Sequence, residues 1–447
     1  MDTSPGLAAL PAPQLVRSTV LLHACANRAV VAAGSALLRA AVRRPHDLGM
    51  PALWAVRHTF FRQFVGGEQL NEVKSLATQL GSNGVRCIVD HSTEELEHAD
   101  ARRDNTAAKL QLVRRLGEEL PETCSFVPVK ITALASPRLL ERLTDGERAV
   151  RAAAGGEQAA AAEAPSLHAA AAAAGLSGEE GRLLEEGLGN LRRLCDGARD
   201  ARLPLLLDAE QTHRQPAISL LARTLSQEYN NSPAASSTGP PLLYNTHQAY
   251  LRGAEGRVRE ELAHARAHGY TLAIKLVRGA YTDGETRSGN GGALQPNKAA
   301  TDAAYDECAA LLLRGVAHAE REGEGEGGGG GEGGGGGGGV AVLLATHNRP
   351  SVARATALMA DLGLGASHPH VHLAQILGMA DDLTLSLGAR GFNAHKLVPY
   401  GKLEEVLPWL LRRLDENQDA LGASAIERLL LRGEVRRRAL QAIGASA

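Results

Sequence analysis

Residues 271–281 read TLAIKLVRGAY, an apolar run that contains Lys275 and ends in the polar stretch Arg278–Tyr281. A short continuous apolar run indicates a strand that is buried on both faces, as in parallel sheets. Seven further runs of this kind occur, each followed by a stretch with helical periodicity. They are Val85–Val89, Phe126–Ile131, Leu203–Leu207, Leu242–Asn245, Val340–Ala345, Val371–Ile376 and Phe392–Val398.

This alternation predicts an α/β fold. Eight β/α units in one chain favour a (β/α)8 barrel that closes on itself. A doubly wound open sheet is the alternative. No G-x-G-x-x-G motif follows the first run, which counts against a dinucleotide-binding sheet.

The composition excludes several classes of protein. The 447 residues include 44% apolar ones and carry a net charge of −2, so the chain is not disordered as a whole. Lysine and arginine total 48 against 50 acidic residues, which gives no support to a nucleic-acid-binding surface. The five cysteines are widely spaced and form no C-x-x-C motif, so a disulfide framework or a zinc ribbon is not expected.

The N-terminal 46 residues contain five arginines and a single acid, Asp2. This composition is typical of a mitochondrial or chloroplast transit peptide. The alternatives are a helical arm that packs on the main domain, or an interfacial helix that rests on a membrane surface. Arginines interrupt the apolar stretch 15–42, which argues against a membrane-spanning helix. We therefore predict a targeting segment and helical arm over residues 1–80.

The barrel is expected to occupy residues 81–447 and to contain two insertions. Residues 152–176 are rich in alanine and lack an apolar period. Residues 323–339 read GEGEGGGGGEGGGGGGG, a composition that predicts a flexible linker.

Polar residues follow almost every predicted strand. In a (β/α)8 barrel the active site lies at the carboxyl ends of the strands, so these residues are expected to converge there. They are Lys130, Asp208–Gln211, Asn245–Gln248, Lys275, Arg278–Tyr281, Thr346–Asn348, Gln375 and Lys396.

Charged residues among them suggest roles. Lys130 lies inside an apolar run, where an unpaired ammonium group is costly, so it is either functional or paired with Asp208 or Glu210. Asp208 and Glu210 form an acid/base pair, a metal site or the counter-ions of a basic cluster. The number of nearby cations favours counter-ions.

Two adjacent arginines, Arg412 and Arg413, lie in a predicted helix over residues 404–418. Their side chains project about 100° apart around the helix axis, and Glu416 is spaced to brace one of them. Such a pair is suited to bind a carboxylate bidentately. A solvated basic face is the alternative, but the position after the eighth predicted strand favours the carboxylate clamp.

The sequences of these segments resemble the proline dehydrogenase family. The resemblance covers most of the chain, with the motifs in the family's order. They are FFRQFVGGE (60–68), VKITAL (129–134), DAEQTHRQPAI (208–218), NTHQAYL (245–251), KLVRGAY (275–281), ATHN (345–348), QILGM (375–379), VPYG (398–401) and LLRRLDEN (410–417).

The resemblance implies a flavoenzyme with a distorted (β/α)8 barrel that binds FAD at the strand ends and oxidises L-proline. It also implies a mitochondrial protein that passes electrons to a membrane quinone, peripherally associated with the matrix side of the inner membrane. By motif, Lys130, Arg412 and Arg413 would bind the substrate carboxylate, and Asp208 and Lys275 would be catalytic. The implied FAD contacts are Gln248, Arg278, Gly279, Ala280, Thr346 and His347. Tyr281 and Ile376 would line the substrate pocket.

Two positions depart from the family pattern. Leu397 stands where the family commonly has a tyrosine that packs on the substrate ring, and Trp409 stands where the family also commonly has a tyrosine. Related hydroxyproline dehydrogenases carry a small residue at the first position, so the choice between proline and 4-hydroxyproline stays open. A metal-dependent barrel hydrolase and a non-catalytic homologue are the remaining alternatives. The hydrolase would use Asp208, His213, His247, His347 and His372.

Overall fold

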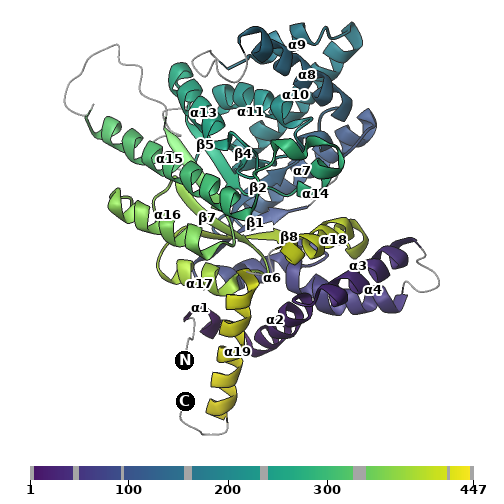
Figure 1. Ribbon diagram of the computed structural model, residues 1–447, viewed down its shortest axis with the longest axis vertical. Helices are drawn as coiled ribbons and strands as arrows, with labels where there is room; N and C mark the ends of the chain where they lie inside the picture. Colours follow the sequence, from purple (N-terminus) through teal and green to yellow (C-terminus); the bar gives the residue numbers. More distant parts are fainter. Residues whose placement is uncertain are drawn as a thin grey trace. The chain divides into compact units, whose positions relative to one another are not determined.

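The computed structural model describes residues 5–43, 50–91, 95–155, 164–231, 240–325, 339–419 and 423–442. Eight parallel strands, β1 to β8, follow one another in chain order and close into a barrel (Figure 1). The predicted (β/α)8 barrel is therefore confirmed, and the open-sheet alternative is wrong.

Each strand coincides with one of the predicted runs. The observed strands are β1 Val85–Asp90, β2 Cys124–Val129, β3 Leu205–Leu207, β4 Leu243–Gln248, β5 Leu272–Val277, β6 Val340–Ala345, β7 Val371–Ile376 and β8 Ala394–Pro399. The prediction for Lys130 was wrong in one respect, because β2 ends at Val129 and a 3-10 turn, η3 Ile131–Ala133, follows it. Lys130 is thus a half-buried residue after the strand.

The chain divides into two compact units, which are described separately. The central unit comprises residues 93–346 and 350–372. In it, β2 to β6 pair in succession, with Thr246 of β4 beside Lys275 of β5. Its helices are α7 Ala99–Glu119, α8 Pro137–Ala153, α9 Leu167–Ala173, α10 Gly178–Asp200, α11 Gln215–Tyr229, α13 Ala254–His268, α14 Thr282–Arg287, η5 Asn290–Ala293, α15 Lys298–Gly325 and most of α16 Arg349–Asp361.

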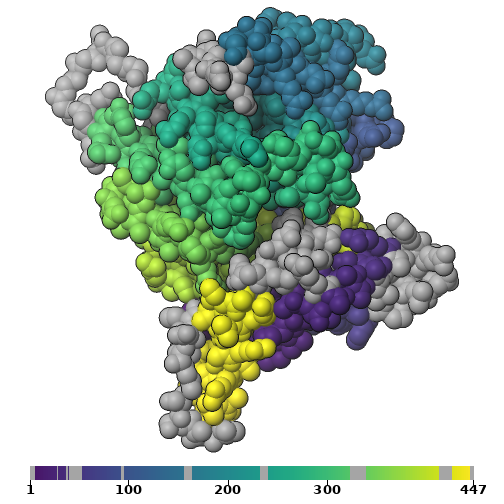
Figure 2. Space-filling view, in the orientation of Figure 1, coloured from purple at the N-terminus to yellow at the C-terminus, as the bar shows by residue number. Residues whose placement is uncertain are grey.

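The terminal unit comprises residues 1–92, 347–349 and 373–447. In it, β8 lies between β1 and β7. The C-terminal helix α19 runs beside the N-terminal helix α2, and Figure 2 shows them in yellow and purple. The helices of this unit are α1 Pro5–Ala8, α2 Ala12–Cys25, α3 Arg28–Arg43, α4 Met50–Val56, η2 Arg57–Phe61, α5 Arg62–Phe64, α6 Leu70–Gly81, α17 Asp381–Ala389, α18 Leu403–Asp419 and α19 Ala423–Ala442.

Helices α1 to α6 precede β1 in the chain, and the division into an N-terminal arm over residues 1–80 and a barrel over residues 81–447 stays a prediction. Within the alanine-rich segment, residues 167–173 form α9, while residues 156–163 lie outside the described part of the chain. Most of the glycine-rich segment, residues 326–338, also lies outside it. Among the described helices, none combines the length and the apolar character needed to cross a membrane.

Candidate functional site

A carboxylate and an ammonium group meet where β3 and β5 lead into their loops. Asp208 directly follows β3, and its backbone N–H donates to the carbonyl oxygen of Val129, 2.9 Å away. Lys275, on β5, donates from Nζ to Oδ1 of Asp208 at 2.6 Å. Both side chains are largely buried, at 14% and 24% exposure for Lys275 and Asp208. The structure confirms that Asp208 is the counter-ion of a cation at the strand ends.

Glu210 is buried two residues farther along the same loop. Its Oε1 accepts hydrogen bonds from the backbone N–H and the hydroxyl of Thr132, at 3.2 and 3.0 Å. Burial raises the pKa of Glu210, although these hydrogen bonds and the charge of Lys130 act in the opposite direction. Lys130 is therefore electrostatically linked to Glu210. Gln248, at the end of β4, donates from Nε2 to the carbonyl oxygen of Glu210 at 2.9 Å.

Arg278 is held from several sides just after β5. Its Nε donates to Asp302 Oδ1 at 2.9 Å, and its two terminal nitrogens donate to the hydroxyls of Thr346 and Ser351. The guanidinium carbon lies 4.4 Å from the ring centroid of Tyr305, in cation–π geometry. Burial alone would raise the pKa of Asp302, but hydrogen bonds from Lys298 and Arg278 lower it below its ordinary value. The structure thus brings together Arg278 and Thr346, two of the predicted cofactor contacts.

The turn after Arg278 requires glycine. Gly279 has a φ of +141°, and a Cβ built there would lie 2.2 Å from the ring of Tyr250. Ala280 is exposed, and half-buried Tyr281 immediately precedes α14. The turn therefore leads the chain from the end of β5 into α14.

In the terminal unit, four of the predicted site residues lie together. The backbone N–H of Ile376, at the end of β7, donates to His347 Nε2 at 2.9 Å, so this nitrogen is the acceptor. Ile376 pairs in register with half-buried Leu397 on β8. Ile376 also packs against the cluster that contains buried Trp409. Trp409 is thus a core residue of this unit.

For the two arginines of the predicted carboxylate clamp, the structure describes the position of the backbone only. Arg412 and Arg413 lie in α18, which confirms that they are helical. Their side chains lie outside the described residues.

A buried charge network in the terminal unit was missed at the sequence level. Lys396, on β8, is 1% exposed and lies 2.7 Å from Oδ1 of Asp381. Its ammonium group also donates to the carbonyl oxygens of Ile376 and Met379, at 3.1 and 2.6 Å. It therefore fixes the turn that follows β7. A lysine within an otherwise apolar strand was the available signal.

Two further acids complete this network. Asp382 forms an ion pair with Arg349. Glu427 of α19 is buried and interacts electrostatically with this pair and with the Lys396–Asp381 pair. Burial, followed by repulsion from Asp381 and Asp382, raises the pKa of Glu427 to about 8. With Glu427 protonated, the remaining two acids balance the two cations.

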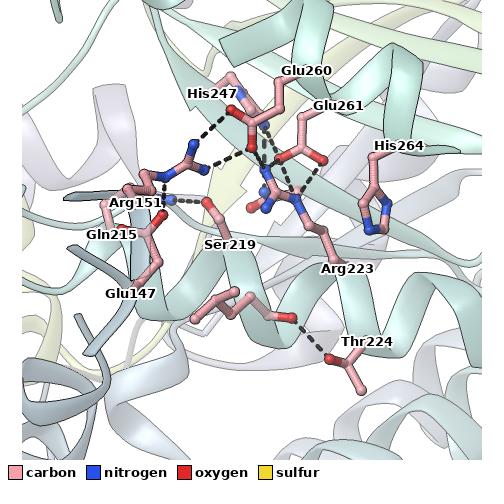
Figure 3. Close-up of polar contacts among 12 residues, drawn as sticks. Glu147, Arg151, Gln215, Ser219, Arg223, Thr224, His247, Glu260, Glu261 and His264 are labelled. Atoms are coloured by element: carbon pink, nitrogen blue, oxygen red, sulfur yellow. Dashed lines mark hydrogen bonds and ion pairs between the residues drawn. The ribbon is translucent and has the colours of Figure 1, made fainter. Parts of the chain in front are cut away.

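The histidines of the hydrolase alternative have other partners. His247 Nε2 lies 3.8 Å from Glu261, and burial lowers the pKa of His247 to about 4. Figure 3 shows the ion-pair network around it, in which Arg151 and Arg223 converge on Glu260 at 2.7 and 2.6 Å. Within the described ranges, no three histidine, cysteine or acidic side chains are arranged to hold a metal ion.

The polar groups at the strand ends of the central unit suit a flavin. Thr246, 3% exposed and beside Lys275 in register, has a buried hydroxyl with no hydrogen-bond partner among the described residues. A buried polar group of this kind normally has a partner, which a ligand would supply. The contacts of Arg278 engage three of its five N–H groups. Lys275, Arg278 and Thr246 therefore form a donor set that matches the acceptor atoms of a flavin and its phosphates. The sequence placed Thr246 among the polar residues at the strand ends but assigned it no contact with the cofactor.

Comparisons with known proteins identify the family of the chain. The family model described as proline dehydrogenase matches residues 73–425. Hydroxyproline dehydrogenase of Bos taurus is 34% identical over 449 residues, which cover 96% of this chain and 90% of the bovine protein. Proline dehydrogenase 1, mitochondrial, of Arabidopsis thaliana is 30% identical over 453 residues, with 97% of this chain and 85% of the plant protein covered.

The fold is also found among solved structures. Proline utilization A (PutA) from Bdellovibrio bacteriovorus, inactivated by N-propargylglycine, superposes with a TM-score of 0.60 at 20% identity and covers 80% of this chain. This chain spans about a third of that protein, 32% of its length. On the family model and the sequence relatives together, the chain belongs to the proline dehydrogenase family.

Proposed function

We propose that this protein is an FAD-dependent proline dehydrogenase that oxidises L-proline to 1-pyrroline-5-carboxylate and passes the electrons to a membrane quinone. The observation that carries the proposal is the Lys275–Asp208 pair, 2.6 Å apart, at strand ends that carry the family's motifs. Arg278 and the unpartnered hydroxyl of Thr246 support it, because they offer donors to a bound flavin.

The proposed chemistry assigns a task to each group. Bound FAD would supply the hydride acceptor for oxidation of the substrate ring at C5. Lys130, Arg412 and Arg413 bind the substrate carboxylate and so fix the ring. Lys275 and Arg278 supply positive charge where negative charge increases during the reaction. Neighbouring cations and desolvation also lower the pKa of the substrate amine, which must be unprotonated to release hydride.

The remaining predicted contacts shape the site. Gln248, Gly279, Ala280, Thr346 and His347 are proposed to contact FAD. Tyr281, Ile376, Leu397 and Trp409 are proposed to surround the substrate. Asp208 keeps the ammonium group of Lys275 in place.

Purified protein is expected to show a flavin absorption spectrum that L-proline bleaches under anaerobic conditions. The same protein should contain no stoichiometric zinc or iron. A colourless protein that stays unreactive after reconstitution with FAD would refute the proposal.

A second candidate substrate is 4-hydroxyproline. The relatives of Bos taurus and Mus musculus, at 34% and 33% identity, are named hydroxyproline dehydrogenases. Leu397 favours proline, because a 4-hydroxyl next to an apolar side chain loses a hydrogen bond. We therefore expect a higher kcat/KM for L-proline than for trans-4-hydroxy-L-proline. The opposite preference would assign the protein to hydroxyproline oxidation.

Replacing Arg413 by alanine is expected to raise the KM for L-proline at least tenfold, because the substrate carboxylate loses a charged partner. Flavin content should stay unchanged. The KM of the Arg413→Lys variant should stay close to that of Arg413→Ala, because an ammonium group cannot reproduce the bidentate hydrogen bonds of a guanidinium group. Steady-state kinetics of both variants, with Arg428→Ala on α19 as the control, tests the assignment. A KM within twofold of wild type would remove Arg413 from the substrate site.

A mitochondrial, membrane-associated setting is part of the proposal. The Arabidopsis thaliana relatives are named as mitochondrial, and the N-terminal segment is rich in arginine. Val16 and Val20 on α2, and Ile426 and Leu429 on α19, are exposed apolar side chains on two neighbouring helices. They are compatible with peripheral association on the matrix side of the inner membrane, where a quinone is accessible.

A further inference from the structure

A buried carboxylate joins the segments that follow β3 and β5. Glu285, on α14, is 1% exposed. Its Oε1 accepts a hydrogen bond from the backbone N–H of Thr212, and its Oε2 accepts one from the Thr212 hydroxyl, each at 2.6 Å. Hydrogen bonds to an ionised acceptor are stronger than those between neutral groups. Both oxygens of Glu285 are thus engaged by a single residue.

Thr212 is also bound by two other elements. Asn290 of η5 donates from Nδ2 to the Thr212 hydroxyl at 3.2 Å. Arg148 of α8 donates to the Thr212 carbonyl oxygen at 3.0 Å. All three polar groups of Thr212 therefore have partners, on three different elements.

This junction lies close in sequence to the proposed catalytic pair. Thr212 follows Asp208 by four residues in the loop after β3, and Glu285 follows Tyr281 by four residues. The ion pair of Lys275 with Asp208 is the first link between these segments, and the Glu285–Thr212 junction is the second. Two links restrict the loop more than one, so Asp208 has less freedom to turn away from Lys275.

We propose that Glu285 is a positioning residue, which fastens Thr212 and thereby holds the Asp208 carboxylate against the Lys275 ammonium group. The inference rests on the proposed function, because the catalytic role of that pair does. We assign Glu285 no proton-transfer role, because its side chain is buried and each of its oxygens accepts a hydrogen bond from Thr212. It acts through Thr212 without touching the substrate.

The test uses the full-length holoprotein with Glu285→Gln, Thr212→Val and the double variant. Misplacement of catalytic groups by a fraction of an ångström to 1 Å costs up to 100-fold in rate. We expect Glu285→Gln to lower kcat about tenfold, with flavin content unchanged and the absorption bands of the bound flavin shifted. Thr212→Ser should retain near-wild-type kcat, because it keeps the hydroxyl donor.

The double variant distinguishes positioning from separate effects. If the two residues act as one junction, its loss of kcat should be no greater than that of the worse single variant. If the loss of kcat in the double variant equals the product of the losses in the two single variants, the proposal is overturned. A wild-type kcat for Glu285→Gln would also overturn it. Glu180→Gln is the matched control, because the Glu180 carboxylate also accepts a hydrogen bond from a nearby backbone N–H, that of Ser177, but in the exposed first turn of α10.

The rate of cleavage by trypsin does not depend on catalysis, so it tests the role of Glu285 separately from the proposed function. Arg287, near the end of α14, is exposed to trypsin. Cleavage after Arg287 should be faster in Glu285→Gln than in wild type, because the junction that restrains α14 is weakened. Faster cleavage together with a wild-type protein that does not oxidise proline would support the junction and refute the proposed function. Unchanged cleavage would overturn the junction even in an active enzyme.

Discussion

Replacing Lys275 by methionine is expected to lower kcat/KM for L-proline by roughly 100- to 1000-fold, the loss typical of removing one preorganised donor to developing charge. The variant removes the cation that Asp208 contacts at 2.6 Å and leaves that carboxylate without this partner. The negative charge then lies where the proposed reaction requires positive charge. Stopped-flow measurement of anaerobic flavin reduction by L-proline checks the expectation directly.

Two comparisons sharpen this test. Lys74→Met, on α6, removes a lysine from a surface helix and should leave flavin reduction within twofold of wild type. Asp208→Asn keeps the ammonium group of Lys275 and should therefore cost less than Lys275→Met. If Lys275→Met reduced its flavin at the wild-type rate, Lys275 would have no part in catalysis.

Replacing Lys396 by methionine is expected to lower the free energy of unfolding by about 3–5 kcal/mol, the usual cost of breaking a buried ion pair from one side. The carboxylate of Asp381 would remain buried without this partner, and two carbonyl oxygens would lose a donor. Urea denaturation followed by circular dichroism measures the change.

Matched variants identify the cause of that loss. Arg115→Met breaks a half-exposed pair with Glu119 on α7 and should cost less than about 1 kcal/mol. Adding Asp381→Asn to Lys396→Met should recover part of the stability, because it removes the stranded charge. No recovery in the double variant would show that the loss comes from packing instead of charge.

The barrel was predictable because its strands are buried on both faces. Each strand therefore appears in the sequence as a short apolar run, and all eight runs became strands. The end of β2 was misjudged because Ile131 continues the apolar pattern of the strand, while the backbone has already turned into a 3-10 helix. Apolar periodicity reports burial, and burial continues past the end of this strand.

The candidate site was predictable only in part. Asp208 directly follows an apolar run and Lys275 lies within another, near its end, so their convergence could be expected from the barrel alone. The Glu285–Thr212 junction could not, because the two residues are 73 positions apart and neither ends a strand. Likewise, the partners of Lys396 lie at the end of β7, in the turn after it and at the start of α17, and no pattern within β8 specifies them. Contacts between loops and helices depend on tertiary packing, which the spacing of residues within one segment does not encode.

Because of Glu427, the docking of the C-terminal helix α19 depends on pH. The pKa of Glu427 is about 8 when α19 is docked, above the ordinary value of 4.5, so docking takes up a proton at neutral pH. Docking is therefore strongest at low pH, weakens steadily as the pH rises from about 4.5 to about 8, and is then constant. Deprotonation of Glu427 as the pH rises therefore weakens the docking of α19 next to the acids Asp381 and Asp382. Proton uptake by one carboxyl group thus sets how tightly the end of the chain stays attached.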